Sequence, residues 1–322
     1  MELAELTTLR LGGPAGRLVE ARTDDEVVAA VPEAALVLAG GSNVVVADEG
    51  VAGTVVRIAT RGIDRDGSRL TVAAGEPWDD LVARTVAEGL QGFECLSGIP
   101  GSVGATPIQN VGAYGQEVAE TIESVRVYDR EADRVLELPA AECGFGYRTS
   151  AFRYHDRHVV LAVTFRLRED TRSGPLRYAE LARTLGVPVG GSAPLADVRE
   201  AVLRLRRGKG MVIDPADPDS VSAGSFFTNP ILDAAPAGAP AWPEPDGRVK
   251  TSAAWLIEHA GFERGYGNGR VAISTKHTLA LVNRGGATTA ELMTLAREIA
   301  AAVKDRFGVS LHPEPVLVGH SW

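Results

Sequence analysis

The chain has 322 residues, of which 45% are apolar and 23% are charged, and its formal net charge is −9. This length favours two or three packed units over one small core. The negative charge disfavours a general nucleic-acid binder, which needs a basic surface, and no stretch approaches the ~20 consecutive apolar residues of a membrane span.

Cys95 and Cys143 are the only cysteines, and they lie far apart among apolar or glycine-rich neighbours. They form neither a disulfide framework nor a metal-ligand spacing, so we expect two buried thiols and no bound metal. The N-terminus begins with acidic and polar residues and lacks a signal-peptide pattern, so we expect a cytoplasmic protein.

Short β-rich runs dominate the first half of the chain. Apolar, β-branched stretches separated by glycine or aspartate predict strands at residues 36–38, 44–46, 54–58, 70–74, 124–128 and 159–165. One helix is predicted from about Trp78 to Leu90, because Leu81, Val82 and Val86 recur on one face.

The second half contains the clearer helical patterns. A stripe of Val198, Val202 and Leu205 predicts a helix over residues 195–207 that stops at Gly208, and a short helix is predicted over residues 252–260. The last helix has a capping-box pattern at Thr288 and Glu291 and ends before Gly308. Residues 231–249, rich in Ala, Pro and Gly, predict a loop. This mixture predicts an α+β protein.

Two glycine-rich segments follow strand-like runs. The first is Gly40-Gly41-Ser42-Asn43, and the second covers residues 96–105 and continues through residues 109–115. Glycine allows close approach of a ligand, and successive backbone N–H groups form a nest for phosphate oxygens. Each segment alone is equally typical of a tight turn, but together they favour a dinucleotide site. The Rossmann, P-loop and nucleophile-elbow motifs are absent.

Four further motifs follow in chain order: Phe145-Gly146-Tyr147-Arg148-Thr149-Ser150, Ala223 to Pro230, Ala253 to Ile257, and Leu311-His312-Pro313-Glu314-Pro315. With the glycine-rich segments, they resemble the UDP-N-acetylenolpyruvoylglucosamine reductase (MurB) family from about Thr7 to Val318. The tyrosine of Leu176-Arg177-Tyr178 resembles the substrate-covering loop of the family's type I branch; the alternative is an ordinary surface tyrosine at a helix start.

The resemblance implies a vanillyl-alcohol-oxidase-type FAD-binding domain of two subdomains, at residues 1–67 and 68–194, and a C-terminal α+β substrate-binding domain at residues 195–322. It implies FAD held without a covalent bond, in agreement with the absence of histidine near Gly40–Asn43, and NADPH as electron donor. We expect a monomer that reduces UDP-N-acetylglucosamine enolpyruvate and has no nucleic-acid or membrane partner.

The site residues that the resemblance implies fall into two binding groups. For FAD they are Gly40, Gly41, Ser42, Asn43, Gly98, Ile99, Pro100, Gly101, Ser102, Gly104, Ala105, Asn110, Gly112, Ala113 and Tyr114. For the substrate they are Tyr147, Tyr178, Lys209, Asn229, Lys250 and His277. Lys209 alternatively compensates a helix dipole, and Lys250 is alternatively a solvent-exposed side chain.

The implied reaction adds hydride to the vinyl carbon of an enolpyruvyl ether and then a proton to the enolate-like partner. A cation, an acid and a second polar group are needed, and motif matching assigns Arg148, Ser225 and Glu314. Spacing alone favours a surface ion pair for Arg148, a loop or cap serine for Ser225 and a surface turn for Glu314, and only the resemblance favours catalytic roles. Two other functions stay open: a sugar or hydroxyacid oxidase on the same flavin fold, and an inactive flavin- or nucleotide-binding module.

Overall fold

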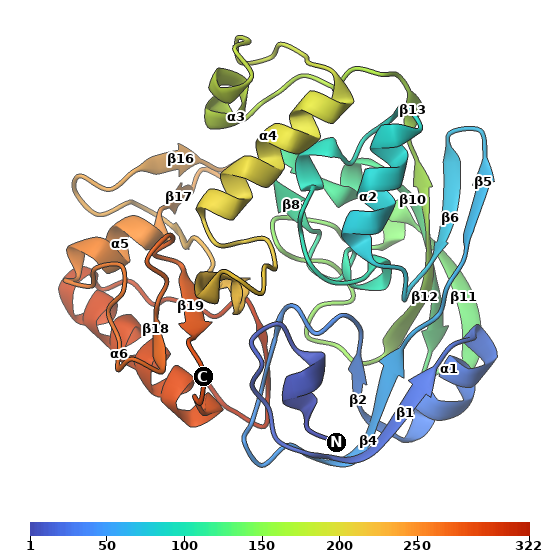
Figure 1. The fold of residues 1–322 in the computed structure, drawn as a ribbon, viewed down its shortest axis with the longest axis horizontal. Coiled ribbons are helices and arrows are strands. Elements are labelled where there is room, and N and C mark those ends of the chain that lie inside the picture. Colours follow the sequence, from blue (N-terminus) through green and yellow to red (C-terminus); the bar gives the residue numbers. More distant parts are fainter. The chain divides into compact units, whose positions relative to one another are not determined.

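Residues 1–322 of the computed structural model divide into two units, each with its own hydrophobic core (Figure 1). Unit 1 combines Met1–Ala15, Gly41–Ala52 and Gly208–Trp322, and unit 2 combines Gly16–Gly40 and Gly53–Arg207. The α+β class is confirmed. The three-domain division at residues 67 and 194 stays a prediction.

A five-stranded antiparallel sheet forms the centre of unit 2, with strand order β11-β10-β12-β6-β5. The middle strand, β12, is buried along almost its whole length. This burial explains the unbroken apolar run from which the strand was predicted. The strands are β5 (Ile63–Asp66), β6 (Arg69–Ala73), β10 (Ile122–Asp129), β11 (Arg134–Pro139) and β12 (His158–Arg166).

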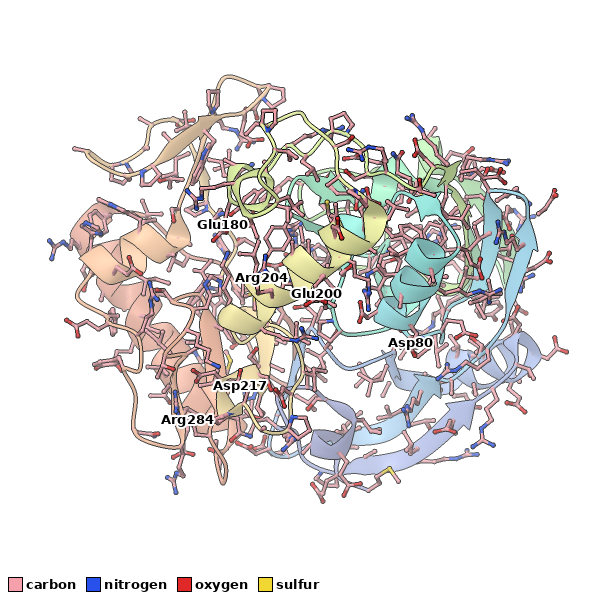
Figure 2. All side chains as sticks on the ribbon, turned by 45° about the horizontal axis from the view of Figure 1, so that its top comes forward. Asp80, Glu180, Glu200, Arg204, Asp217 and Arg284 are labelled. Atoms are coloured by element: carbon pink, nitrogen blue, oxygen red, sulfur yellow. The ribbon has the colours of Figure 1, made fainter.

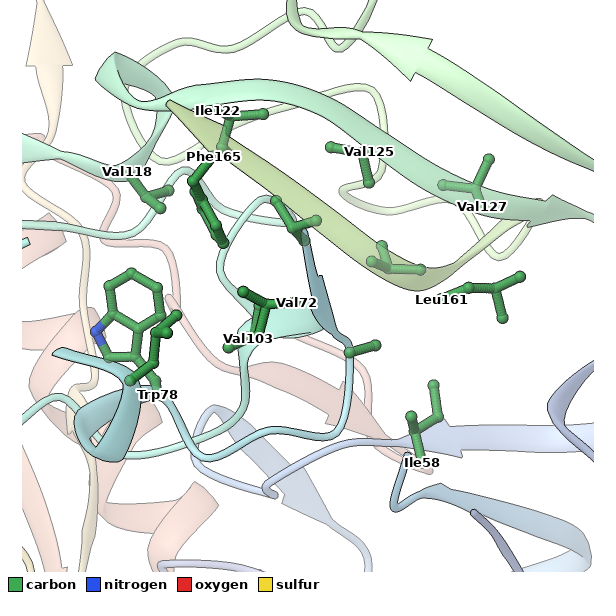
Figure 3. Packing of buried hydrophobic residues seen from close by; sticks show 14 of the residues in the cluster. Ile58, Val72, Trp78, Val103, Val118, Ile122, Val125, Val127, Leu161 and Phe165 are labelled. Atoms are coloured by element: carbon green, nitrogen blue, oxygen red, sulfur yellow. The ribbon is translucent and has the colours of Figure 1, made fainter. Parts of the chain in front are cut away.

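Helix α2 (Trp78–Ala87) buries its apolar face in the same core as this sheet. The Trp78 ring packs against Phe93 with centroids 4.8 Å apart, and Phe93 packs against Phe165 of β12 at 4.9 Å. Figure 3 shows Trp78 and Phe165 together with Val72 and Val103 in this cluster. Burying aromatic rings of this size contributes strongly to the stability of unit 2.

A second, three-stranded sheet of order β1-β4-β2 accompanies helix α1 (Asp24–Ala30), whose N-cap Thr23 accepts a hydrogen bond from the Glu26 amide. The strands are β1 (Ala15–Ala21), β2 (Ala34–Leu38) and β4 (Val51–Ile58). Four short strands form two further pairs: β7 (Leu90–Gln91) with β13 (Arg168–Glu169), and β8 (Gly112–Ala113) with β9 (Gln116–Glu117).

Helices α3 (Ala179–Thr184) and α4 (Leu195–Gly208) enclose a smaller core that includes Cys95. The outer face of α4 carries Glu200 and Arg204, which Figure 2 labels. Arg206 is buried instead, because it lies four residues after Val202 on the helix's apolar stripe. The two expected buried thiols are confirmed.

Unit 1 is built around the sheet β14-β19-β18 and the helices α5 (Ala253–His259) and α6 (Thr289–Phe307). The strands are β14 (Ser222–Ser225), β18 (Val271–Ile273) and β19 (Ala280–Asn283). The predicted capping box is confirmed, since the Thr288 side chain accepts from the Glu291 amide and the Glu291 side chain accepts from the Thr288 amide.

Two further strand arrangements complete unit 1. The parallel pair β3 (Val44–Val46) and β20 (Val316–Val318) joins residues remote in sequence. The sheet β15-β17-β16 contains Ile231–Leu232, Val249–Thr251 and Ala241–Pro243. The prediction of one loop over residues 231–249 was therefore wrong: β-branched and aromatic residues at its ends and middle pair across the Pro/Gly-rich turns.

All six predicted strands and all four predicted helices are confirmed, several of them with different ends. The helix predicted to reach Leu90 stops at Ala87, because Gly89 adopts a φ of +69° and Leu90 enters β7. No helix of the structure combines the length and the apolar character needed to cross a lipid bilayer.

Candidate functional site

The two glycine-rich segments meet backbone to backbone in unit 2. A Cβ placed on Gly40 would lie 2.6 Å from Gly101 Cα, a distance that no side chain tolerates. The glycine at this contact is therefore required by packing. The contact joins the first predicted cofactor segment to the second.

The loop from Gly98 to Ala105 is fixed by α2 and by the segment before it. Trp78 N–H donates to Gly101 O at 3.0 Å, and Val103 and Gly104 N–H donate to Glu76 O and Ala74 O at 2.9 and 2.8 Å. Ile99 and Pro100 lie within this loop, and Ala105 ends its short 3₁₀ turn (Val103–Ala105). These three backbone hydrogen bonds hold the loop in its conformation.

Asp79, in the first turn of α2, ties this loop to α4. Its carboxylate accepts from Gly98 N–H at 2.6 Å and from both terminal nitrogens of Arg199 at 2.6 and 2.9 Å. Burial alone would raise the pKa of Asp79, but the hydrogen bonds from Arg199 and Gly98 hold it below its usual range. Asp79 is therefore a carboxylate at neutral pH.

The hydroxyl of Ser102 is buried and has no hydrogen-bond partner in the protein. Buried polar atoms are nearly always paired, so an unpaired hydroxyl inside a glycine-rich loop indicates a missing acceptor. A phosphate oxygen of FAD would satisfy it. The residues of this loop fit the pyrophosphate that the sequence predicts here.

Arg148 lies against the second part of the same glycine-rich segment. Its Nη2 donates to Gly112 O at 2.7 Å and its Nη1 lies 3.4 Å from Asn110 O. A Cβ on Gly112 would come within 2.9 Å of the Arg148 guanidinium. One predicted catalytic residue is thus held directly by two predicted cofactor-binding residues.

Three residues of this region have left-handed backbones although each has a side chain. The φ angles are +43° at Asn110, +50° at Tyr114 and +51° at Arg148. This conformation costs roughly 1–2 kcal/mol for a residue with a Cβ. Such strain concentrates at functional sites, where surrounding contacts hold it.

The other two predicted catalytic residues lie on neighbouring antiparallel segments of unit 1. Ser225 ends β14 after an irregularity at Gly224, and Glu314 N–H donates to Phe226 O at 2.8 Å. Thr228 N–H donates to His312 O at 3.1 Å, and Phe227 bridges to Pro313. Ser225 and Glu314 are both half-buried, so neither is sealed within the core of unit 1.

Asn43 connects the first glycine-rich segment to Glu314. Its carbonyl accepts from Val316 N–H at 2.9 Å, and its side-chain Nδ2 lies 3.5 Å from Glu314 O. Ser42 and Gly41 precede it in the same unit, where the Gly41 carbonyl accepts from Thr8 N–H at 3.0 Å. The structure therefore places Asn43, Ser225 and Glu314 on adjoining segments of unit 1.

Both predicted substrate-binding tyrosines, Tyr147 and Tyr178, lie in unit 2. Tyr178 caps the start of α3, is 42% exposed, and packs edge to face on Tyr114 with centroids 5.3 Å apart. Tyr147 precedes Arg148, whose guanidinium lies 5.4 Å from the Tyr147 ring centroid. Both tyrosines are thus next to predicted cofactor or catalytic residues.

The remaining predicted substrate-binding residues lie in unit 1 and have structural contacts. Lys250 is not the solvent-exposed lysine of the alternative prediction, because it is partly buried and forms an ion pair with Glu244 at 2.8 Å. Asn229 Oδ1 accepts from Ala253 N–H at 3.0 Å, at the start of α5. His277 N–H lies 3.2 Å from Ser274 Oγ, and Lys209 follows the end of α4. Their substrate-binding role stays a prediction.

Sequence reasoning missed three charged residues of this region: Asp79, Arg199 and Arg206. Burial lowers the pKa of Arg206, while Tyr114 and Asp79 nearby favour its charged form. Arginine keeps its proton in proteins, so this is a buried cation. Its position on the stripe of Val198 and Val202 could have revealed it, whereas no local pattern marks Asp79.

Two protein-family models match the chain. The model for an FAD binding domain covers residues 15–138, and the model for the C-terminal domain of UDP-N-acetylenolpyruvoylglucosamine reductase covers residues 215–318. The reductase of that name from Thermobifida fusca is 58% identical over 98% of this chain and 96% of its own length. The chain belongs to the UDP-N-acetylenolpyruvoylglucosamine reductase family.

Further relatives agree with this assignment. The Streptomyces avermitilis reductase is 57% identical and covers 98% of this chain. The crystal structure of the reductase (MurB) from Thermus caldophilus is 28% identical, superposes with a TM-score of 0.72, and covers 99% of this chain and 97% of its own. As a member of this reductase family, the chain is an FAD-binding oxidoreductase of peptidoglycan precursor synthesis, and the expected fold is confirmed.

Proposed function

We propose that this protein uses NADPH to reduce the enolpyruvyl group of UDP-N-acetylglucosamine enolpyruvate, giving UDP-N-acetylmuramate. The family assignment supports the reductase activity, and the donor, the substrate and the roles of individual residues are the proposal. The observation that supports it most is the pairing of the Ser225 and Glu314 segments through Glu314 N–H and Phe226 O at 2.8 Å.

FAD, when bound, would supply the hydride chemistry that links NADPH oxidation to reduction of the substrate's vinyl group. Gly40–Asn43, the loop 98–105 and residues 110–114 would hold it, and the buried hydroxyl of Ser102 could donate to one of its phosphate oxygens. We propose that FAD binds without a covalent bond, and the absence of a histidine near Gly40–Asn43 agrees with this.

The protein's own residues act on the negative charge that develops on the substrate. Arg148 is permanently charged, and its planar fork suits the carboxylate of the enolpyruvyl group. A positive charge fixed before the reaction stabilises the enolate without reorganisation. The contacts to Gly112 and Asn110 hold this guanidinium in place.

Ser225 delivers the proton that completes the reduction. A hydroxyl is a weak acid, so its conjugate base needs a positive charge nearby and its acceptor must be a strongly basic enolate. Glu314 helps to polarise the substrate, and its backbone is restrained by Pro313 and Pro315. We further propose that Tyr178 belongs to a type I substrate-covering loop, and that the protein works in the cytoplasm as a monomer.

Purified protein tests this proposal directly. It should be yellow, release FAD on denaturation, and oxidise NADPH only when the enolpyruvyl sugar nucleotide is present, without net peroxide. NADPH oxidation that produces peroxide regardless of this substrate would indicate an oxidase on the same fold. FAD binding without turnover would indicate an inactive flavin-binding module.

A further inference from the structure

The turn that carries Arg148 is a two-residue hairpin. Gly146 N–H donates to Thr149 O at 3.1 Å and Thr149 N–H donates to Gly146 O at 3.3 Å, which leaves Tyr147 and Arg148 at the tip. Arg148 takes the second tip position with a φ of +51°. Glycine or asparagine usually fills a left-handed turn position, so contacts outside the turn must hold this arginine there.

Asn110 supplies one of these contacts. It is 1% exposed, and its side-chain Nδ2 donates to Gly146 O at 3.1 Å and to Glu117 at 2.8 Å. Its Oδ1 accepts from Ala119 N–H at 3.1 Å. The side-chain amide of Asn110 therefore fixes the base of the turn at Gly146.

Arg153 supplies the contact at the tip. It is 8% exposed, its Nη1 donates to the carbonyl oxygen of Arg148, and its guanidinium lies 4.4 Å from the Tyr154 ring centroid. This hydrogen bond fixes the peptide group between Arg148 and Thr149. The left-handed conformation of Arg148 determines how that peptide group is oriented. A buried cation next to one backbone carbonyl also makes a strong, charge-assisted hydrogen bond.

We infer that Arg153 is a positioning residue for Arg148, holding the strained turn so that the Arg148 guanidinium is preset for the substrate carboxylate. The inference rests on the proposed role of Arg148 in reducing the enolpyruvyl group. Arg153 acts through the Arg148 backbone and has no contact with substrate in this assignment. Its loss should impair only the step in which Arg148 takes part.

The test compares Arg153→Met and Arg153→Lys in the full-length, FAD-loaded protein. FAD per chain and the melting temperature are measured first. Stopped-flow absorbance then follows flavin reduction by NADPH and flavin reoxidation by the enolpyruvyl substrate separately.

The Arg153→Met variant should keep its FAD content and its rate of flavin reduction within about twofold of wild type. Its flavin reoxidation should be slower by about 10²-fold, the cost of misplacing a catalytic group by about 1 Å. Lysine keeps a charged donor and should restore most of the rate.

Two comparisons make this result specific. Arg148→Met and the double variant Arg148→Met/Arg153→Met should reoxidise at similar rates, because residues that act as one unit are not additive. Arg126→Met is the matched control: Arg126 is a partly buried arginine of the same unit that lies on β10 and pairs with Asp24. It should leave reoxidation unchanged.

Unchanged reoxidation in Arg153→Met, beside slow reoxidation in Arg148→Met, would overturn the inference alone. Multiplicative effects in the double variant would also overturn it, as would an equal loss of FAD, flavin reduction and reoxidation. Unchanged reoxidation in Arg148→Met would overturn the proposed role of Arg148 and the inference with it. If Arg153→Met does not fold, Arg153→Gln, which loses the positive charge but keeps a polar side chain, replaces it under the same criteria.

Discussion

The Tyr178 ring stands at 87° to the Tyr114 ring, with the two centroids 5.3 Å apart. Tyr114 ends the glycine-rich segment predicted to bind FAD, and Tyr178 begins α3 in the loop predicted to cover the substrate. An edge-to-face pair of this kind contributes about 0.5–1.5 kcal/mol beyond simple burial. The contact therefore couples the position of the Tyr178 loop to the cofactor-binding segment.

Two substitutions of Tyr178 distinguish the contribution of its ring from that of its hydroxyl. Tyr178→Phe should keep the melting temperature and FAD content, because the ring contact remains, while KM for the sugar nucleotide rises by about 10-fold through loss of a hydrogen bond to a charged group. Tyr178→Ala should lower the free energy of unfolding by about 1 kcal/mol as well. Steady-state kinetics and urea unfolding measure both effects. An unchanged KM in both variants would contradict the covering-loop prediction.

Ser225→Ala should leave flavin reduction by NADPH nearly intact and slow the second half-reaction. Removing a positioned general acid costs roughly 10²–10⁴-fold, because the enolate must then take its proton from solvent. Stopped-flow reoxidation by the enolpyruvyl substrate gives this rate. Reoxidation at the wild-type rate would remove Ser225 from the mechanism.

Gly112→Ala should displace the Arg148 guanidinium without removing it. The new methyl group would lie 2.9 Å from Arg148 Nη1 and 3.0 Å from Glu117 Cγ, so both side chains must move. We expect flavin reoxidation to slow by about 10–10²-fold, and flavin reduction to change much less. A matched Gly174→Ala variant is the control, because a Cβ there meets no atom within 4 Å.

Asp79→Asn should destabilise the folded protein by about 1–2 kcal/mol at neutral pH. Its partner Arg199 would lose an ionic acceptor, but 35% of the Asp79 side chain is exposed, so solvent weakens the pair. Because the folded-state pKa of Asp79 is lowered, its contribution is complete above the usual value of 3.8 and is lost as the pH falls through the folded-state value. Urea unfolding at about pH 7, 5 and 3 should show the difference from wild type shrinking in acid.

Neither cysteine should react with a thiol reagent in the native protein. Burial raises the pKa of Cys143 to about 11 and raises that of Cys95 further. At pH 8, only about one Cys143 in a thousand would be a thiolate, and both side chains are shielded. Denaturation in guanidinium chloride should release two reactive thiols per chain. Rapid modification before unfolding would contradict the buried positions.

The elements with a clear periodic pattern could be predicted from the sequence. The stripe and capping box of α6 and the unbroken apolar run of β12 are signals carried by neighbouring residues. Strands β15 to β17 were missed because each has only two or three residues between Pro- and Gly-rich turns. Each of these strands pairs with a partner up to about twenty residues away in the sequence. A pattern of neighbouring residues cannot predict such a pairing.

The candidate site was predictable only where several residues form one motif. Arg148, Ser225 and Glu314 each lie in a run of matching residues, and the family resemblance identified them. Arg153 lies just after such a run and Asp79 lies outside all of them, and their roles depend on a carbonyl or an amide that folding brings close. A contact between a side chain and a backbone group far away in the sequence does not produce a recognisable sequence motif.

The parallel pairing of β3 with β20 also bears on how the protein is made. Residues 44–46 are synthesised about 270 residues before their partner strand at residues 316–318. The edge of β3 therefore stays unpaired until those residues are made, and it is exposed meanwhile to aggregation with other nascent chains. Unit 2 is complete by residue 207 and has no such delay.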